Sequence, residues 1–250
     1  MIPPRLPAGR LAALALAALL GGCAVASTGD GRNPGAASAY AELGMGYLGQ
    51  GESDRARQAF ERALDQDPHD PTALHGIALL EHRAGNDEIA ERYYQRTLLE
   101  LPRRDQRSAD EIPSETPVRN NYAALLYEEQ RYTEACEQLE RAAGDTAYAG
   151  RARVLVNLSQ CQLHLGETAA ARASLNLAER IAPDQPTVLL ALAYLDYAER
   201  DMGASRARLT QYERLAGLTR EGRALHEALE NTADASPNTL EPASSAIDQP

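Results

Sequence analysis

The chain has 250 residues, of which 44% are hydrophobic and 24% charged, and its formal net charge is −11. It contains no lysine. This acidic balance excludes a nucleic-acid-binding protein, because phosphate backbones are bound by lysine and arginine. It also argues against binding of anionic lipid headgroups through the folded surface.

The first 22 residues have the order of a secretory signal. Arg5 and Arg10 precede an apolar run from Leu11 to Leu20, and small residues follow. The run is too short for a membrane-spanning helix, which needs about 20 apolar residues. Leu20-Gly21-Gly22-Cys23 resembles the lipobox of bacterial lipoproteins, which implies cleavage before Cys23 and a diacylglycerol on its sulfur. An ordinary secretory signal or an uncleaved apolar anchor is the alternative.

Cleavage before Cys23 removes the two arginines of the signal and lowers the formal net charge from −11 to −13. In the lipoproteins that this segment resembles, the residue after the cysteine directs sorting, and Ala24 implies the outer membrane. Each buried methylene contributes about 0.8 kcal/mol, so several acyl chains would anchor the protein stably. Residues 23–36 are small and polar, and we predict a flexible tether there.

Residues 37–70 carry a pattern that predicts two packed helices. Leu43 and Tyr47 share one face of the first helix, and Gly44 lets the second helix approach closely. The second helix has apolar residues at i, i+4 and i+7. Neither helix can bury its apolar stripe alone, so the pair needs neighbours. The spacing resembles the 34-residue tetratricopeptide pattern at Tyr40, Leu43, Gly44, Tyr47, Gly51, Ala56, Phe60, Ala63 and Pro68.

The same residue types return at 34-residue intervals, which separate helices of a generic bundle would not do. The predicted fold is therefore all-α, a tetratricopeptide-repeat superhelix of about five repeats with a C-terminal capping helix. The predicted segments are repeats 1 and 2 over residues 37–104, an inserted loop over 105–115, repeats 3 to 5 over 116–219, a capping helix over 220–230 and a disordered tail over 231–250.

The first helices of such a superhelix line a concave groove, and repeat positions 2, 5, 9 and 12 usually face it. The tyrosines and aliphatic residues at these positions gather in the C-terminal half and favour an apolar peptide or helix as the ligand. Each tyrosine could instead pack on a neighbouring helix. The groove candidates are Met45, Leu48, Thr72, His75, Leu79, His82, Asn120, Tyr127, Arg153, Val156, Gln160, Leu163, Leu190, Tyr194 and Tyr197.

Asn121, Arg153 and Asn157 are similar to part of the clamp by which some tetratricopeptide domains hold a partner's C-terminal carboxylate. The basic residue that should complete the clamp is missing, because His75 and Leu79 stand there. This absence favours the alternative that the asparagines bond to loops or to repeat backbone.

No motif in the chain indicates an enzyme. His75 and His82 could share a helix face, but no acidic or cysteine partner is spaced to complete a metal site. No serine stands in a nucleophile elbow, and no glycine-rich phosphate loop occurs. We predict no enzymatic activity, no cofactor, no metal and no small-molecule substrate. The covalent acyl lipid on Cys23 is the one non-protein group expected.

Cys136 and Cys161 remain once Cys23 is lipidated, in a compartment that permits disulfides. They fall on the second helix of repeat 3 and the first helix of repeat 4, which pack together. A bond requires that the two α-carbons lie within about 7 Å. Two buried free thiols are the alternative.

A narrower resemblance covers roughly residues 37–216. A lipobox and two repeats are followed by Asn120-Asn121-Tyr122, then Arg131-Tyr132-x-Glu134-Ala135, then Arg151 to Cys161 and Ala182-Pro183. This arrangement resembles the type IV pilus biogenesis lipoproteins of the PilF/PilW kind. Ala123 and Gln130 replace two glycines of that family, and the loop 105–115 is an insertion.

The resemblance implies a pilotin, a lipoprotein that binds a secretin subunit in the periplasm. Its anchor would deliver that subunit to the outer membrane, where the subunits oligomerise into the pilus pore. The competing hypothesis is a different tetratricopeptide lipoprotein, which would serve as a scaffold for peptidoglycan enzymes or for outer-membrane assembly factors.

Overall fold

A computed structural model describes residues 33–101 and 114–231 of the chain. The signal segment, the expected lipidation site Cys23, most of the inserted loop and nearly all of the tail lie outside the described residues. The described part consists of helices labelled α2 to α12 and contains no strand. None of these helices has the length and apolar character needed to cross a membrane.

The first ten of these helices pair into five hairpins, and the last helix packs on the fifth hairpin. This arrangement confirms the predicted all-α superhelix of about five repeats with a capping helix. The hairpins are α2 (Pro34–Gly49) with α3 (Ser53–Gln66), α4 (Pro71–Arg83) with α5 (Asp87–Glu100), α6 (Glu115–Glu128) with α7 (Tyr132–Ala143), α8 (Arg151–His164) with α9 (Thr168–Ile181) and α10 (Pro186–Ala198) with α11 (Met202–Ala216); the last helix is α12 (Arg220–Asn231).

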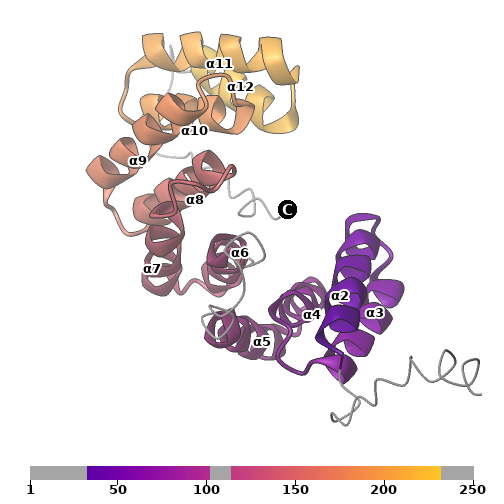
Figure 1. Ribbon diagram of the computed structural model, residues 1–250. Coiled ribbons are helices and arrows are strands. Elements are labelled where there is room, and N and C mark those ends of the chain that lie inside the picture. The colour runs from indigo at the N-terminus through magenta and orange to yellow at the C-terminus, as the bar shows by residue number, and fades with distance from the viewer. Residues whose placement is uncertain (1–32, 102–113, 232–250) are drawn as a thin grey trace, which may run out of the picture.

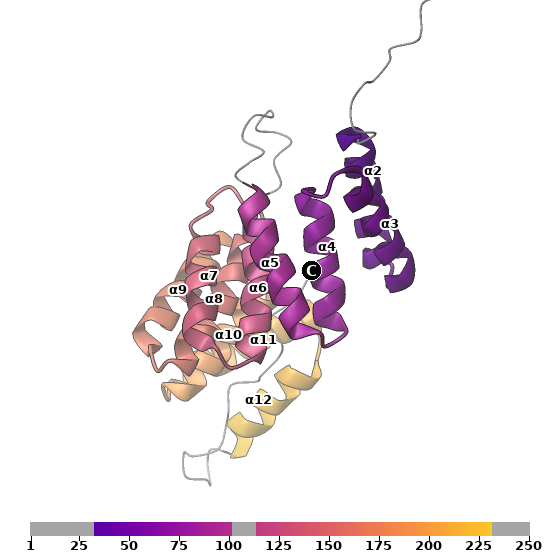
Figure 2. The ribbon, with the colours of Figure 1, turned by 90° about the horizontal axis from the view of Figure 1, so that it is seen from below.

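The hairpins stack into a curved arc (Figure 1). Helices α4, α6 and α8 line its inner side, and α5, α7 and α9 lie outside. The two ends of the arc differ, because α12 covers the last hairpin and projects from it in the second view (Figure 2). First helices therefore line the concave side, as the sequence predicts.

Helix starts differ slightly from the predicted segment bounds. Asn33 caps α2 by accepting hydrogen bonds from the backbone N–H groups of Gly35 and Ala36, and Pro34 stands in the first turn. The helix therefore begins inside the segment that was expected to be tether. Ser114 caps α6 in the same way, so Glu115 belongs to a helix and not to the inserted loop.

The turn inside each hairpin has one residue in the left-handed conformation, always at repeat position 15. Glycine fills this position in three repeats, with φ between 74° and 77° at Gly51, Gly85 and Gly166. Gln130 and Arg200 hold φ angles of 62° and 69° at the equivalent positions of repeats 3 and 5. The same turn thus forms with and without glycine.

Phe60 shows why glycine is needed on the first helices. Its fully buried ring lies between Gly44 of α2 and Gly76 of α4. A Cβ atom at Gly44 would lie 2.4 Å from the ring, and one at Gly76 would lie 2.2 Å from it. The ring therefore joins repeats 1 and 2. The main hydrophobic core runs from α2 to α10, and a second cluster lies among α10, α11 and α12.

Candidate functional site

The described residues contain no group of three or more His, Cys, Asp or Glu side chains that could hold a metal ion. Their candidate functional features are surfaces and contacts between repeats. Three surfaces or contacts matter: the concave groove, the junctions between repeats and the exposed end of the first repeat.

Nearly half of the predicted groove residues are buried between helices. Tyr127, for example, packs edge-on against Tyr132 and His164, with ring centroids 5.2 and 5.1 Å apart. Such side chains hold repeats together and leave little area for a ligand. The buried set is Leu48, His75, Leu79, His82, Asn120, Tyr127 and Val156.

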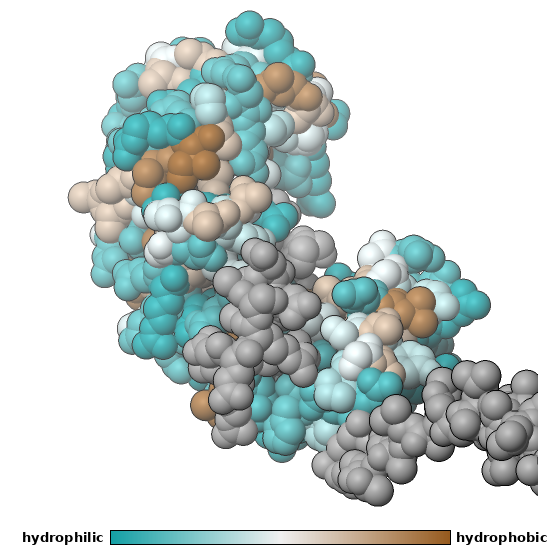
Figure 3. Space-filling view, in the orientation of Figure 1, coloured by the Kyte–Doolittle hydropathy of each residue, from teal (hydrophilic) through white to brown (hydrophobic). Residues whose placement is uncertain are grey.

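The remaining groove candidates keep part of their surface exposed. Most of them lie on α8 and α10. The space-filling view shows apolar surface near α9 and α10 (Figure 3). The partly exposed set is Met45, Thr72, Arg153, Gln160, Leu163, Leu190, Tyr194 and Tyr197. Tyr194 also has a structural contact, because its hydroxyl donates a hydrogen bond to the Glu221 carbonyl at 2.9 Å. Replacing Tyr194 is therefore expected to lower stability as well.

The asparagines of the possible clamp bond to side chains of neighbouring repeats, not to loops or backbone as expected. Asn157 donates to Asn120 Oδ1 at 2.9 Å, and Asn121 Nδ2 lies 3.0 Å from His75 Nε2. All four side chains are buried. The Nε atom of Arg153 is buried without a hydrogen-bond partner. Both asparagines of the clamp are thus engaged in holding first helices together.

One repeat position makes a link to the next repeat at every junction. Position 21, counted from residues 37, 71, 116, 152 and 186, directly follows a small residue of the second helix, which is alanine in repeats 1 to 4 and Ser205 in repeat 5. Its partner lies in the next repeat or in α12. The links are Arg57 to Glu81 at 2.6 Å, Glu91 to Arg131 at 2.9 Å, Cys136 to Cys161 by a disulfide, Arg172 to Asp196 at 2.6 Å and Arg206 to the carbonyl of Leu229 at 2.9 Å.

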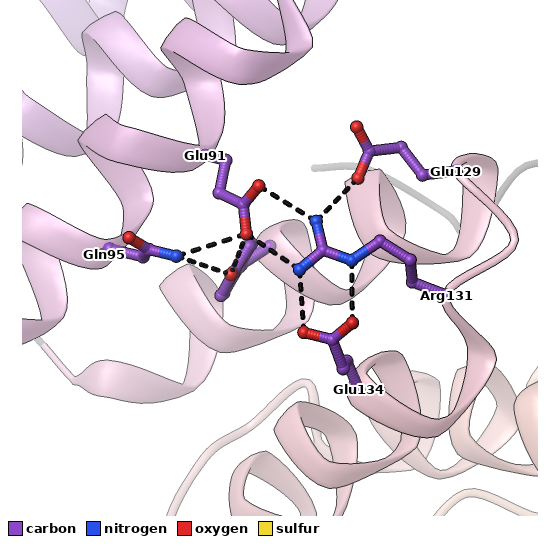
Figure 4. A network of polar contacts seen from close by, with 6 residues as sticks. Glu91, Gln95, Glu129, Arg131 and Glu134 are labelled. Atoms are coloured by element: carbon purple, nitrogen blue, oxygen red, sulfur yellow. Dashed lines mark hydrogen bonds and ion pairs between the residues drawn. The ribbon is translucent and has the colours of Figure 1, made fainter.

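The link between repeats 2 and 3 is an extended polar network (Figure 4). Arg131 forms two hydrogen bonds with Glu91 of α5, at 2.9 and 3.0 Å, and two with Glu134 of α7, at 2.8 and 2.7 Å. It also contacts Glu129 at 2.9 Å, and the Tyr122 hydroxyl donates to Glu91 at 2.6 Å. The hydrogen bonds from Arg131 lower the pKa of the Glu91 carboxyl, so the network stays ionised near neutral pH.

The link between repeats 3 and 4 is covalent. Cys136 of α7 and Cys161 of α8 form a disulfide with α-carbons 5.7 Å apart. The bridge closes a loop with a sequence separation of 25 residues. Such a crosslink stabilises a fold by roughly 3 kcal/mol, chiefly because it restricts the unfolded chain.

The first repeat has an apolar face that no other repeat covers. Position 7 is a large aliphatic residue or a tyrosine in all repeats, and in repeats 2 to 5 the second helix of the preceding repeat packs against the helix that carries it. Leu43 occupies this position in repeat 1 and is 45% exposed. The equivalent residues have exposures of 0 to 5%: Ile77, Tyr122, Leu158 and Leu192.

We call this surface of α2 the end face, and define it by Tyr40, Leu43 and Tyr47. The two tyrosines are partly exposed, and Arg55 lies 5.1 Å from the ring centroid of Tyr47. Apolar surface is visible over the α2–α3 hairpin (Figure 3). The sequence analysis placed Leu43 and Tyr47 on one face of the first helix but did not identify that face as exposed. In the described residues no repeat precedes repeat 1, so no second helix covers its position 7.

Comparison with known proteins places this architecture in a family. A model of the tetratricopeptide repeat matches residues 41–109 and 123–186. The type IV pilus assembly protein PilF of Pseudomonas aeruginosa is 34% identical over 179 residues, which cover 72% of this chain and 66% of PilF. The match thus spans slightly less than two thirds of PilF.

Solved structures agree with this match. The structure of Pseudomonas aeruginosa PilF has a TM-score of 0.68 at 30% identity, and the match covers 80% of this chain and 85% of PilF. PilW, described as a widely conserved type IV pilus biogenesis factor, has a TM-score of 0.66 at 20% identity, covering 79% and 87%. The likeness to PilW shows the fold alone. Together these matches confirm the resemblance that the sequence indicates.

Proposed function

Because the chain belongs to the tetratricopeptide repeat family and is homologous to PilF, we propose that it is an adaptor in type IV pilus biogenesis. In this proposal it has no enzymatic activity and binds a secretin subunit in the periplasm. A lipid on Cys23 anchors it to the outer membrane and brings the bound subunit there for assembly. Binding affinity and a tether are sufficient for this mechanism.

The end face is the observation that carries the proposal. Its equivalents in repeats 2 to 5 are each covered by an α-helix from the preceding repeat. The same surface in repeat 1 therefore fits an amphipathic helix supplied by another protein. Leu43 and the two tyrosines supply the apolar and aromatic area that commonly dominates binding.

Charge adds a second feature to the expected partner. Residues 37–70 contain seven acidic side chains and three arginines, a formal net charge of −4. Residues 152–219 contain seven of each and are neutral. We therefore expect the partner helix to carry basic residues beside its apolar stripe. The partly exposed surface of Leu163, Leu190 and Tyr197 in the groove offers a further contact for the same subunit.

A pull-down with lipidated full-length protein tests the proposal. Leu43→Glu places a charge in the end face and is expected to weaken secretin binding about tenfold or more. Leu99→Glu is the matched control, because Leu99 is 69% exposed on α5, a second helix away from the end face. Both variants should fold, which circular dichroism can verify.

Two outcomes would contradict the proposal. Equal secretin binding by the wild type and Leu43→Glu would remove the end face from the mechanism. Recovery of peptidoglycan enzymes or outer-membrane assembly factors without secretin would assign the protein to the competing scaffold function.

A further inference from the structure

His75 is a buried titratable group at the junction between repeats 2 and 3. It lies on α4 with 9% of its surface exposed, and its Nε2 atom is 3.0 Å from the amide nitrogen of Asn121 on α6. Because that amide nitrogen can only donate, Nε2 accepts and the imidazole is neutral. In the arrangement that the structure shows, the contact thus joins the first helices of two repeats through a neutral His75.

Asn121 has a polar atom that this arrangement does not use. Its side chain is fully buried, and its Oδ1 atom has no hydrogen-bond partner. A protonated His75 would place an N–H group against the Asn121 amide nitrogen, which is a contact between two donors. Rotation of the amide would present Oδ1 instead. The rotated amide would restore a hydrogen bond to the charged imidazole, but its neutral oxygen would not balance the buried positive charge.

The surroundings of His75 do not compensate a positive charge. From α5, Tyr94 faces it with ring centroids 6.0 Å apart, and the Tyr94 hydroxyl is buried without a partner. From α3, the apolar ring of Phe60 lies against Gly76, the next residue of α4. Burial alone lowers the pKa of His75 from 6.5 to about 4.

Three charged or titratable groups on α4 and α5 are paired with side chains of other helices. On α4, Glu81 is bound by Arg57 of α3, and His82 is paired with Glu128 of α6. On α5, Glu91 is bound by Arg131, and it accepts a hydrogen bond from Tyr122 of α6. No ion pair joins His75 to an acidic side chain in the described residues, so a charged imidazole would lack a counter-charge and would draw water into the junction.

The chain connection at this junction is also the longest between hairpins. Fourteen residues separate the end of α5 at Glu100 from the start of α6 at Glu115, whereas four residues join α3 to α4 and four join α9 to α10. The next junction is crosslinked by the Cys136–Cys161 disulfide. Loss of side-chain contacts would thus free the first two repeats from the others more readily here than at the next junction.

We propose that the His75–Asn121 contact makes the junction between repeats 2 and 3 an acid-sensitive joint. Uptake of one proton from solvent by His75 loosens α4 from α6 and lets repeats 1 and 2 move relative to repeats 3 to 5. This inference is independent of the proposed partner.

The direction of the pH dependence follows from the pKa of His75. The folded value of about 4 lies below the unfolded value of 6.5, so the unfolded or opened state binds the proton more strongly. The closed junction is fully favoured above about pH 6.5 and is progressively lost as the pH falls toward 4. Each unit of difference between the two pKa values corresponds to a factor of about ten in the opening equilibrium.

Hydrogen exchange of the full-length protein between pH 7 and pH 4, corrected for intrinsic exchange rates, tests the joint. In the wild type, amide protection in α4 and α6 is expected to fall by about tenfold to a hundredfold relative to α8 and α9. His75→Gln keeps an acceptor for Asn121 but cannot titrate, so this selective loss should vanish. His226→Gln is the control, because His226 is half exposed on α12.

Loss of protection in His75→Gln equal to that in the wild type would overturn the proposal, as would a loss spread evenly along the wild-type chain. If His75→Gln folds poorly, Asn121→Asp provides a second test. A carboxylate at position 121 can accept a hydrogen bond from the charged imidazole, so the acid-dependent opening should disappear. Persistence of the opening in that variant would also contradict the joint.

Discussion

At the scale of single residues, the left-handed turn at repeat position 15 shows how neighbouring helices impose a conformation. Glycines at this position could be read from the sequence as helix ends. Gln130 and Arg200 could not, because their residue types do not favour a positive φ. The flanking helices fix both ends of these turns, so the strained conformation persists despite a cost of about 1–2 kcal/mol.

Gln130→Gly should therefore stabilise the protein. Removing the strain at φ 62° is expected to add about 1 kcal/mol to the free energy of unfolding, partly offset by the greater freedom of glycine in the unfolded chain. Urea denaturation measures the change. Gly166→Ala is the reverse control. It should lower the free energy of unfolding by a similar amount, because it places a side chain at a left-handed φ of 77°. Unchanged or lower stability of Gln130→Gly would contradict the argument.

The disulfide gives a second prediction at this scale. Alkylation without reductant should leave Cys136 and Cys161 unmodified, and mass spectrometry should detect both thiols only after reduction. The Cys136→Ser and Cys161→Ser double variant is expected to lose roughly 3 kcal/mol of stability in urea denaturation. Two alkylated thiols in the untreated protein would disprove the bridge.

At the scale of helices and repeats, the sequence predicts most of the architecture, because the spacing of apolar and small residues fixes where helices pack. The links at position 21 were not predictable from that spacing. An arginine, a glutamate and a cysteine at the same repeat position share no residue type, and only the packed structure shows that each reaches the next repeat.

The sequence predicted which side chains lie on the concave side but not which of them are exposed there. Repeat positions locate a side chain on the concave side but do not say how closely the adjacent first helices approach. His75 and Asn120 contact neighbouring first helices and are buried, whereas Leu190 and Tyr197 keep exposed surface. The end face at Leu43 was missed because position 7 is normally a core position.

The capping helix provides a prediction for a single element. Leu225 and Leu229 are buried in the cluster that joins α12 to the fifth hairpin. Replacing either leucine by alanine is expected to cost about 2–5 kcal/mol. Hydrogen exchange should show the largest loss of amide protection in α10, α11 and α12, because each repeat in a stack is stabilised mainly by its neighbours.

Leu218→Ala is the control for these variants, since Leu218 is 54% exposed in the turn before α12. It should change stability by less than about 0.5 kcal/mol. An equal loss of protection in α2 to α5 of the Leu225 variant would show that the stack unfolds as one unit instead.

At the scale of the whole molecule, the two ends of the arc have different roles. One end is closed by α12, and the α2–α3 hairpin forms the other end (Figure 1), where Leu43 of the end face is 45% exposed. The charge is uneven along the arc: residues 37–70 carry a net −4 and residues 116–149 a net −3, whereas residues 71–104 and 152–219 are neutral. The most acidic repeat thus lies at the end of the arc opposite α12.

Salt should therefore affect how fast the partner binds. Raising the salt concentration from about 0.05 to 0.5 M is expected to slow association roughly tenfold, because screening removes the attraction between the acidic repeats and a basic helix. Dissociation should change little. Surface plasmon resonance with immobilised secretin measures both rates, and an association rate independent of salt would contradict the proposed charge complementarity.

The most direct test of the adaptor mechanism is an assay of secretin multimers in the outer membrane of cells that express the wild type, Cys23→Ala or Leu43→Glu. We predict abundant multimers with the wild type. The Cys23→Ala variant should still bind secretin but leave it outside the outer membrane. The Leu43→Glu variant should bind secretin weakly and therefore bring little of it to the outer membrane. Normal multimers in the outer membrane with both variants would contradict the account.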